Sequence, residues 1–303
     1  MYLLWNDIKT FLKKYKHFFQ VSLSLVILII IIHKVDLSST LKALISIDVN
    51  IILLLLSITI LKLTSQILYW LLCLKLNEGF NSTFYIIVKT HLIGLALRFV
   101  LPAGLATFGK VYYIDQIDKK KTFFSILIEK FIFTWAIILF ATWAAIYAIN
   151  SFWFLFLLLF LAIFIVPFIL PLFLKRNPNF EYLIQRRYYR VLPRLIAIQI
   201  IFRILTIAQY FIILNFLTDL NLYFFDVAIV SSLILVSNII PFTFNGLGLR
   251  EVFAIYLLPQ IGVSPEIAIV TTLLIFFLNG VLPALPGVFY ILTNKKKFTI
   301  VND

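Results

Sequence analysis

The sequence has few of the residues that form cross-links, bind metals or catalyse acid–base reactions. It contains one cysteine, Cys73, which excludes a disulfide bond within the chain, and three histidines, which form no cluster with the usual spacing of metal ligands. Only 13 residues are acidic, and the sequence contains no Walker loop, no Gly-x-Ser-x-Gly and no His-Glu-x-x-His motif. We therefore expect neither an ATPase nor another enzyme, and neither a cofactor nor a metal.

Charged residues as a whole are scarce, and hydrophobic residues take their place. Charged residues make up 13% of the 303 positions and hydrophobic residues 63%, with a mean hydropathy of +1.07. An ordinary globular domain is about half apolar and roughly a quarter charged. Because no water-soluble fold can bury so much apolar surface, the composition predicts an all-α, polytopic membrane helix bundle, with residues 1–303 forming a single transmembrane domain.

Eight long apolar segments and two short ones fill the chain. The long segments cover residues 18–35, 50–74, 84–101, 122–149, 152–174, 195–217, 225–240 and 268–292. Because no small-residue cleavage site follows the first segment, we expect an uncleaved signal anchor there. The short segments, 102–114 and 245–259, each begin near a proline and a glycine and fall short of the ~20 residues that a crossing helix needs. They predict two half-length or re-entrant helices.

Basic residues gather in four stretches between or beside these segments, namely residues 1–17, 119–121, 175–194 and 295–297. By the positive-inside rule all four face the cytoplasm. This places the N-terminal segment 1–17 and the tail 294–303 on the cytoplasmic side of the plasma membrane. The net charge of +13 thus reflects membrane topology, and we expect no nucleic-acid partner.

The direction of the short segments follows from the same rule. For the four basic stretches to share the cytoplasmic side, the pair 84–101 and 102–114 runs from that side to the outer side and returns. The pair 225–240 and 245–259 runs in the opposite sense, from the outer side to the cytoplasmic side and back. Two broken pairs of opposite direction are typical of an inverted-topology repeat with a substrate site at its interface. The alternative is that both short segments are re-entrant loops that do not cross.

The stretch 238–251 holds the clearest sign of a ligand site. After a proline that ends one helix, Gly246 and Gly248 allow a sharp turn, and the next helix begins with its free N–H groups near Arg250. A helix N-terminus beside an arginine is suited to a phosphate. The alternative is a packed helix hairpin in which Arg250 and Glu251 form an internal ion pair, and the pattern leaves both interpretations open.

A counterpart in the first half of the chain runs from Pro102 and Gly104 to Lys110. Paired interruptions by proline and glycine in the two halves of a membrane protein are a sequence pointer to a transport site. The alternative is an ordinary kinked connection between two helices.

Cations outnumber carboxylates at membrane depth. The charged residues there are Lys62, Lys89, Arg98, Lys110, Lys130, Arg203 and Arg250, against Glu129 and Glu251. Burying each one costs at least a few kcal/mol. An anionic ligand would offset the excess of positive charge, which favours a phosphate-bearing lipid as the partner. For Arg98, Lys110 and Lys130 we favour the simpler interpretation that the side chains extend to the lipid headgroups.

Lys62 and Arg203 lie near the middle of their apolar segments, each on a polar stripe. The stripes are Thr59, Lys62 and Gln66 in one segment, and Gln199, Arg203, Thr206 and Tyr210 in another. Spacings of three and four residues place each stripe on one helix face, which we expect to face the interior of the bundle.

Two further patterns carry a family resemblance. The first is Pro241, then Gly246-Leu247-Gly248-Leu249-Arg250-Glu251, followed by Gly262-Val263-Ser264 and a last helix, and the second is Ile128-Glu129-Lys130-Phe131. They resemble the Pro…Gly-x-Gly-x-x-Glu segment and the Glu-Arg helix of the lysylphosphatidylglycerol synthase transmembrane-region family, which are flippase-like membrane proteins. Most of the chain fits the layout of that family. The resemblance implies the flippase part alone, without the soluble aminoacyl-transfer domain of some members.

From residues and resemblance together we expect an ATP-independent lipid translocator, or a lipid-binding membrane protein, that receives an anionic headgroup between the two Pro/Gly elements. The expected headgroup site comprises Arg250, Lys62 and Arg203 as contacts, Glu129 and Glu251 as groups that orient the cations, and Gly246, Gly248, Pro102, Gly104 and Lys110 from the two elements. The alternative function is a non-transporting accessory subunit that binds an envelope- or lipid-modifying membrane enzyme. A lipid-modifying enzyme is disfavoured, because no acid, base or nucleophile is placed for it.

Overall fold

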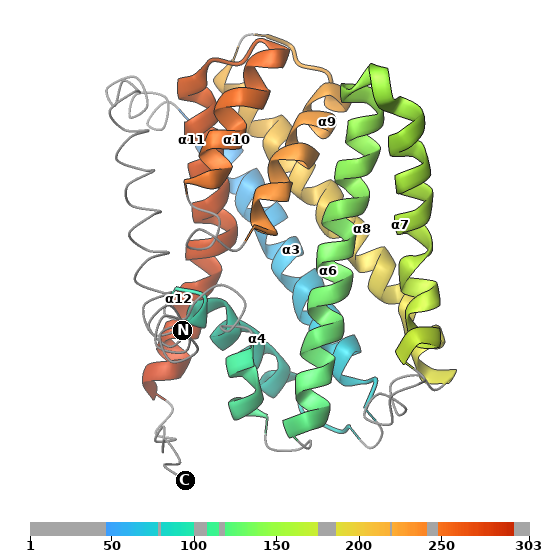
Figure 1. Ribbon diagram of the computed structural model, residues 1–303. Coiled ribbons are helices and arrows are strands. Elements are labelled where there is room, and N and C mark those ends of the chain that lie inside the picture. Colours follow the sequence, from blue (N-terminus) through green and yellow to red (C-terminus); the bar gives the residue numbers. More distant parts are fainter. Residues whose placement is uncertain are drawn as a thin grey trace, which may run out of the picture.

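The computed structural model describes residues 47–77, 80–99, 108–114, 119–174, 186–218, 220–240 and 248–293. Within these ranges all regular secondary structure is helical (Figure 1), which confirms the expected all-α bundle. The expected first helix, the N-terminal segment 1–17 and the tail 294–303 lie outside the described residues.

The described part of the chain forms the following helices. They are α3 (Val49–Leu74), α4 (Phe84–Leu97), η1 (Gly109–Tyr113), α6 (Lys119–Ala148), η2 (Asn150–Phe152), α7 (Trp153–Leu174), α8 (Arg186–Leu217), α9 (Phe224–Ile234), η4 (Leu235–Asn238), α10 (Leu249–Leu257), η5 (Leu258–Ile261), α11 (Pro265–Phe276), η6 (Phe277–Val281) and α12 (Leu282–Thr293). Among them, α3, α6, α7, α8 and the continuous stretch Pro265–Thr293 are long and apolar enough to cross a membrane. The chain is therefore a multi-pass membrane protein.

Two segments that we expected to be long are half-length in the structure. α4 has 14 residues, and α9 has 11 that continue into the four residues of η4, which correspond to about 21 Å and about 25 Å at 1.5 Å per α-helical and 2.0 Å per 3₁₀ residue. Neither length covers a hydrocarbon core of ~30 Å. The expectation that 84–101 and 225–240 each cross as a long helix is thus wrong. A proline follows each helix within a few residues in the sequence, at Pro102 and Pro241, and a proline disfavours helical backbone at the residue before it.

The half-length helices enter the bundle from opposite ends (Figure 1). α4 begins at the end where α3 finishes and α6 starts, whereas α9 and α10 lie in the other half of the molecule. A long helix, a half-length helix, a short return and a second long helix therefore follow one another in α3, α4, η1 and α6, and again with reversed direction in α8, α9, α10 and α11–α12. This order agrees with the expected inverted repeat, and the half-lengths favour re-entrant elements within it.

The two ends of the bundle differ in charge. The end where α6 and α8 begin carries Lys75, Lys119, Lys120, Lys121, Arg187, Arg190 and Arg194. The opposite end carries Asp48, Asp226 and Glu266 instead. Such a separation of basic from acidic ends is typical of a protein with a fixed orientation in the membrane.

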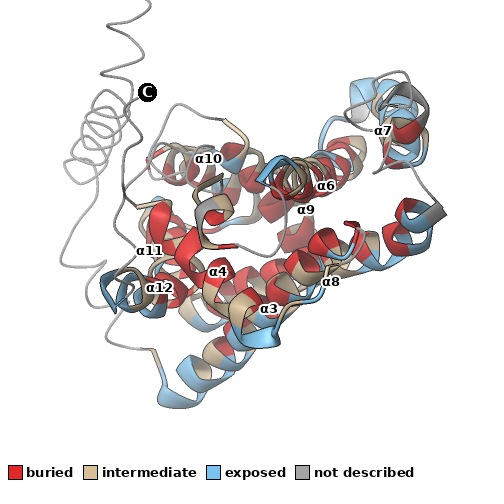
Figure 2. Cartoon of the chain, turned by 90° about the horizontal axis from the view of Figure 1, so that it is seen from below, coloured by how far each residue is buried: buried red, intermediate tan, exposed pale blue. Residues whose placement is uncertain are grey.

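α7 lies at the edge of the bundle, with most of its side chains exposed (Figure 2). Two prolines inside it, Pro167 and Pro171, have no N–H to donate, so the carbonyls of Ile163 and Pro167 lose their helical partners. Neighbouring helices replace both bonds. Trp135 Nε1 in α6 donates to the Ile163 carbonyl at 2.8 Å, and the Tyr188 hydroxyl in α8 donates to the Pro167 carbonyl at 3.0 Å. These two bonds tie α7 to the core, as hydrocarbon requires of freed backbone groups.

The contact between α4 and α12 depends on a glycine. A Cβ atom on Gly287 would lie 2.1 Å from the backbone oxygen of Leu92, so only glycine lets the two backbones approach this closely. Gly287→Ala should therefore force the helices apart and destabilise the protein by about 1–3 kcal/mol. Thermal unfolding in detergent, followed by tryptophan fluorescence, measures the change. Leu285→Ala, at an exposed position of the same helix, is the control, and equal melting temperatures for Gly287→Ala and wild type would contradict the close contact.

α6 begins at one end of the bundle and α9 at the other (Figure 1), so exposed Lys120, the second residue of α6, and exposed Tyr223, just before α9, lie at opposite ends. In a Cys73→Ala background, we expect an impermeant thiol reagent to label only one of Lys120→Cys and Tyr223→Cys in intact cells. Permeabilised cells should show labelling at both positions. Labelling of both cysteines in intact cells would show that the bundle does not cross the membrane as described.

Candidate functional site

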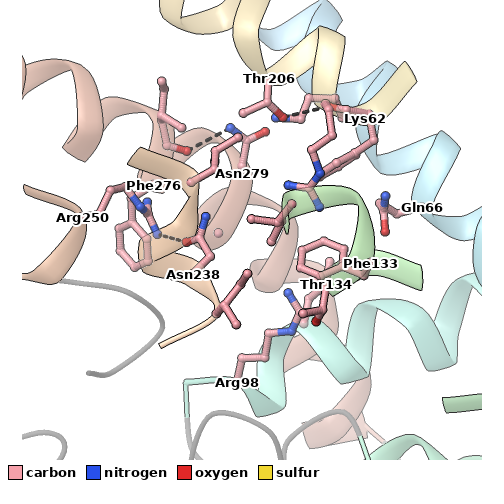
Figure 3. A pocket seen from close by; sticks show the side chains of 18 of the residues that line it. Lys62, Gln66, Arg98, Phe133, Thr134, Thr206, Asn238, Arg250, Phe276 and Asn279 are labelled. Carbon is pink, nitrogen blue, oxygen red and sulfur yellow. Dashed lines mark hydrogen bonds between the residues drawn. The ribbon is translucent and has the colours of Figure 1, made fainter. Parts of the chain in front are cut away.

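A cavity of about 320 Å³ lies where the two half-length elements end inside the bundle (Figure 3). The end of α4 contributes Arg98 and Phe99, and the end of α9 with the start of α10 contributes Asn238 and Arg250. The long helices α3, α6 and α8 and the π-helical turn η6 complete the wall. The cavity therefore occupies the interface between the two halves of the bundle, where the sequence predicted a ligand site.

The wall of the cavity is strongly cationic. Its described charged residues are Lys62, Arg98, Lys130, Arg203 and Arg250, with Glu129 as the only carboxylate among them. The structure thus gathers the three predicted headgroup contacts, Arg250, Lys62 and Arg203, around one space. Arg98 and Lys130 also line it, although the sequence suggested that they extend to the lipid headgroups. The polar stripes of α3 and α8 face inward as expected, since Thr59, Lys62, Gln199 and Arg203 are all at most 4% exposed.

Arg203 is held by aromatic rings. Its guanidinium carbon lies 4.4 Å from the centre of the Phe133 ring and 5.1 Å from that of Phe202, and the residue is 1% exposed. Its Nε and Nη2 have no hydrogen-bond partner among the described residues. Arg203 is thus a fixed cation with unused donors beside the cavity.

Lys62 is held differently, by an amide network. Its Nζ donates to Gln209 Oε1 at 2.8 Å, and the same oxygen accepts a 2.8 Å bond from Asn279 Nδ2. Gln209 Nε2 in turn donates to Thr59 Oγ1 at 3.0 Å. The network joins α3, α8 and η6. Gln209 and Asn279 were not expected from the sequence, although Gln209 lies one turn from Thr206 on the polar stripe of α8, and that spacing points to it.

Arg250 stands at the start of α10. Its Nη2 donates to Asn238 Oδ1 at 3.1 Å, and its guanidinium carbon lies 5.6 Å from the centre of the Phe276 ring. The preceding Gly248 has φ of 83°, which glycine adopts without strain. Glu251 caps the helix, because its Oε2 accepts the Gly248 N–H at 2.6 Å. Glu251 does not line the cavity, and its place at the cap points to a role in fixing the turn that positions Arg250.

Lys110 forms a closed ion pair with Glu129. Lys110 Nζ lies 2.8 Å and 3.0 Å from the two carboxylate oxygens, and 4.3 Å from the centre of the Trp70 ring. Gly94 makes room for it, since a Cβ there would be within 2.4 Å of Lys110 Cε. Lys110 does not line the cavity, and at 1% exposure it does not extend to the headgroups either. The expectation of an exposed Lys110 is therefore wrong, because a buried carboxylate within reach satisfies the ammonium better than a distant surface.

Three residues of the predicted site, Pro102, Gly104 and Gly246, lie outside the described residues. In the described part of the chain no group of three or more histidine, cysteine or carboxylate side chains is placed to hold a metal ion.

Several polar groups around the cavity lack partners in the described structure. Donor atoms without an acceptor there are Gln66 Nε2, Arg98 Nε, Arg203 Nε and Nη2, and the hydroxyl of Tyr210. A buried donor without an acceptor costs ~1–3 kcal/mol, and more when the group is charged. Because nearly all of these atoms can only donate, the group that satisfies them has to be an acceptor. The cavity is therefore chemically suited to an anion with several oxygens.

Comparison with known proteins agrees with the motifs. A family model described as the lysylphosphatidylglycerol synthase TM region matches residues 18–287, which confirms the resemblance drawn from the sequence. No match was found among curated proteins.

The Lys110–Glu129 pair offers a direct test of the buried electrostatics. Glu129→Gln leaves the Lys110 ammonium buried without its counter-charge, so we expect a loss of about 3–5 kcal/mol in the free energy of unfolding. The double variant Lys110→Met/Glu129→Gln should recover most of this loss, because both charges are then absent. Unfolding in detergent measures both variants. A Glu129→Gln protein as stable as wild type would show that the pair contributes nothing to stability.

Proposed function

The chain belongs to the lysylphosphatidylglycerol synthase TM region family, and from this premise we propose that it is an ATP-independent translocator of an anionic membrane lipid. The cationic cavity binds the phosphate-bearing headgroup. No covalent chemistry takes place in the site, which needs neither a metal nor a cofactor. Membership of the family supports lipid handling, whereas the step from lipid handling to translocation rests on the cavity.

The observation that carries the proposal is the unbalanced charge of the cavity. Five cationic side chains line it against one carboxylate, Glu129, among the described residues, and that carboxylate already accepts two bonds from Lys110. An excess of cations over carboxylates in the hydrocarbon region of a membrane is expensive, and charged residues there mark sites where an ion binds or passes. A phosphate supplies both the charge and the acceptor oxygens that the unpartnered donors lack.

The size of the cavity supports a headgroup as the occupant. Its volume of about 320 Å³ lies at the lower end of the ~300–1,000 Å³ typical of small-ligand sites. A phosphate headgroup fits this space, whereas the acyl chains of the same lipid do not. We infer that the acyl chains stay in the bilayer while the headgroup enters the protein, so that lipid binding requires the cavity to open sideways between helices.

The position of the cavity supports movement of the headgroup across the membrane. Both half-length elements end at it, one entering from each side of the bundle. In inverted-repeat transporters such a central site opens alternately to the two sides as one repeat moves against the other. We propose the same here, with the basic end of the bundle in the cytoplasm and the protein in the plasma membrane, as the distribution of lysine and arginine favours.

Arg250→Ala provides the test of translocation. The variant removes a cation and the hydrogen bond to Asn238 from the cavity wall, so we expect the rate of lipid movement to fall at least about ten-fold, since one charge-assisted bond is worth ~1.5–3 kcal/mol. Proteoliposomes containing a trace of fluorescent phospholipid, assayed with a membrane-impermeant quencher, measure the rate. A panel of phosphatidylglycerol, phosphatidic acid, phosphatidylcholine and a polyprenyl phosphate identifies the preferred headgroup.

Arg194→Ala is the matched control, because it removes the same side chain from an exposed position near the basic end of α8. We expect wild-type rates from it. Equal transport by Arg250→Ala and wild type would contradict the assignment of the cavity. Absence of movement of every lipid by folded wild-type protein, together with co-purification of a membrane enzyme, would favour the accessory-subunit function instead.

A further inference from the structure

We propose that Arg203 is the residue that grips the headgroup phosphate directly, through the edge of its guanidinium that carries Nε–H and Nη2–H. Lys62 supports the site by its charge and does not provide the main contact. This inference rests on the proposed function and goes further, because it assigns the binding mode and the atoms responsible for it.

The free edge of Arg203 has the geometry for the task. The Nε–H and Nη2–H groups of an arginine point the same way and form a fork that matches two oxygens of a phosphate or carboxylate. These are the two nitrogens of Arg203 that have no partner among the described residues. Arg203 also lines the cavity and is 1% exposed. The unused pair of donors is therefore a built feature of the cavity wall and does not belong to a solvated surface side chain.

Aromatic rings fix the direction of the fork. The Phe133 ring, from α6, and the Phe202 ring, from α8, lie 4.4 Å and 5.1 Å from the guanidinium carbon of Arg203. Rings at such distances attract the cation without occupying its N–H groups. A guanidinium held in this way loses little conformational entropy when a ligand binds, so its donors are organised before the ligand arrives.

Lys62 is in a different position. Its Nζ already donates to Gln209 Oε1 at 2.8 Å and lies 4.8 Å from the centre of the Phe202 ring. Asn279 donates to the same oxygen, so the acceptor is fixed from two sides. The network takes up one of the three N–H groups of Lys62 and fixes the ammonium as a point charge beside the cavity, whereas both donors of the Arg203 fork are without acceptors among the described residues and lie parallel.

The other cations indicate a phosphate and not a carboxylate. Figure 3 shows Arg98, Arg250 and Lys62 on different sides of the cavity, and Arg98 Nε also lacks an acceptor in the described structure. A carboxylate has two oxygens and one charge, which the fork of Arg203 would use up. A phosphate has oxygens left for the other sides of the cavity while two of them face Arg203.

Arg203→Lys separates the fork from the charge. Lysine keeps the positive charge but offers a single ammonium in place of two parallel donors. We expect the Kd for a tail-labelled phosphatidic acid, measured by fluorescence with the protein in phosphatidylcholine nanodiscs, to rise about ten-fold or more. Arg194→Lys, the same exchange at an exposed position of α8, should leave the Kd within about two-fold of wild type.

A second variant tests the same contact without changing Arg203, in case Arg203→Lys does not fold. Phe133→Leu removes a ring that holds the guanidinium and changes no charge, so we expect a rise in Kd of about three-fold by loss of one cation–π contact. Thermal unfolding verifies that each variant is folded. Wild-type affinity in folded Arg203→Lys, or wild-type affinity in Phe133→Leu, would overturn the assignment of the fork while leaving the translocation proposal intact.

Inorganic phosphate serves as a second probe and separates the two sources of the same chemistry. If labelled lipid binds the wild type and millimolar phosphate displaces it, the fork recognises the phosphate of a lipid headgroup. If phosphate stabilises the wild type but not Arg203→Lys, and no lipid binds, the fork stands and the lipid proposal fails. If acetate displaces the lipid as well as phosphate does, the assignment of a phosphate is overturned.

Discussion

In a hydrocarbon core each charged side chain has to find its partners inside the protein, because no water is there to solvate it. This bundle meets the constraint in two different ways. Lys110 and Glu129 neutralise each other beside the ring of Trp70. Around the cavity the cations exceed the carboxylates, and donor atoms remain without acceptors in the described structure. The Lys110–Glu129 pair is thus neutralised within the chain, whereas around the cavity the described residues provide too few acceptors for the cations.

The backbone obeys the same constraint. Helices that end in the middle of a membrane expose carbonyl and N–H groups, and they are tolerated only where those groups are buried in protein or line a cavity. α4, and α9 with its continuation η4, end at the cavity wall. The same two helix ends therefore interrupt the helices and form part of the site. In α7 the cost of two prolines is offset by side chains of α6 and α8. In α7 the positions of the prolines thus decide where neighbouring helices have to supply hydrogen bonds.

The cavity is also rigid where recognition would take place. Aromatic rings hold Arg203, an amide network holds Lys62, and a capped glycine turn positions Arg250. Two of these supports cross between the halves of the bundle, since Phe133 of α6 contacts Arg203 of α8, and the Lys62 network joins α3 to α8 and η6. Movement of one half of the bundle against the other would therefore rearrange the contacts of Arg203 and Lys62, so that the hold on an anion would differ between the two states of an alternating-access cycle.

The sequence by itself determined the all-α membrane bundle, the family and the polar stripes of α3 and α8, because hydropathy, proline and glycine spacing and three-and-four periodicity are local properties. It also identified Lys62, Arg203 and Arg250 as cations at membrane depth, where cations outnumber carboxylates. The tertiary structure decided which charges are paired. Lys110 and Glu129 are 19 residues apart and Lys62 and Gln209 are 147 residues apart, and no local pattern fixes such distances. It decided as well that α4 and α9 stop halfway, since a proline shows where a helix ends but only packing shows how deep in the bundle that end lies.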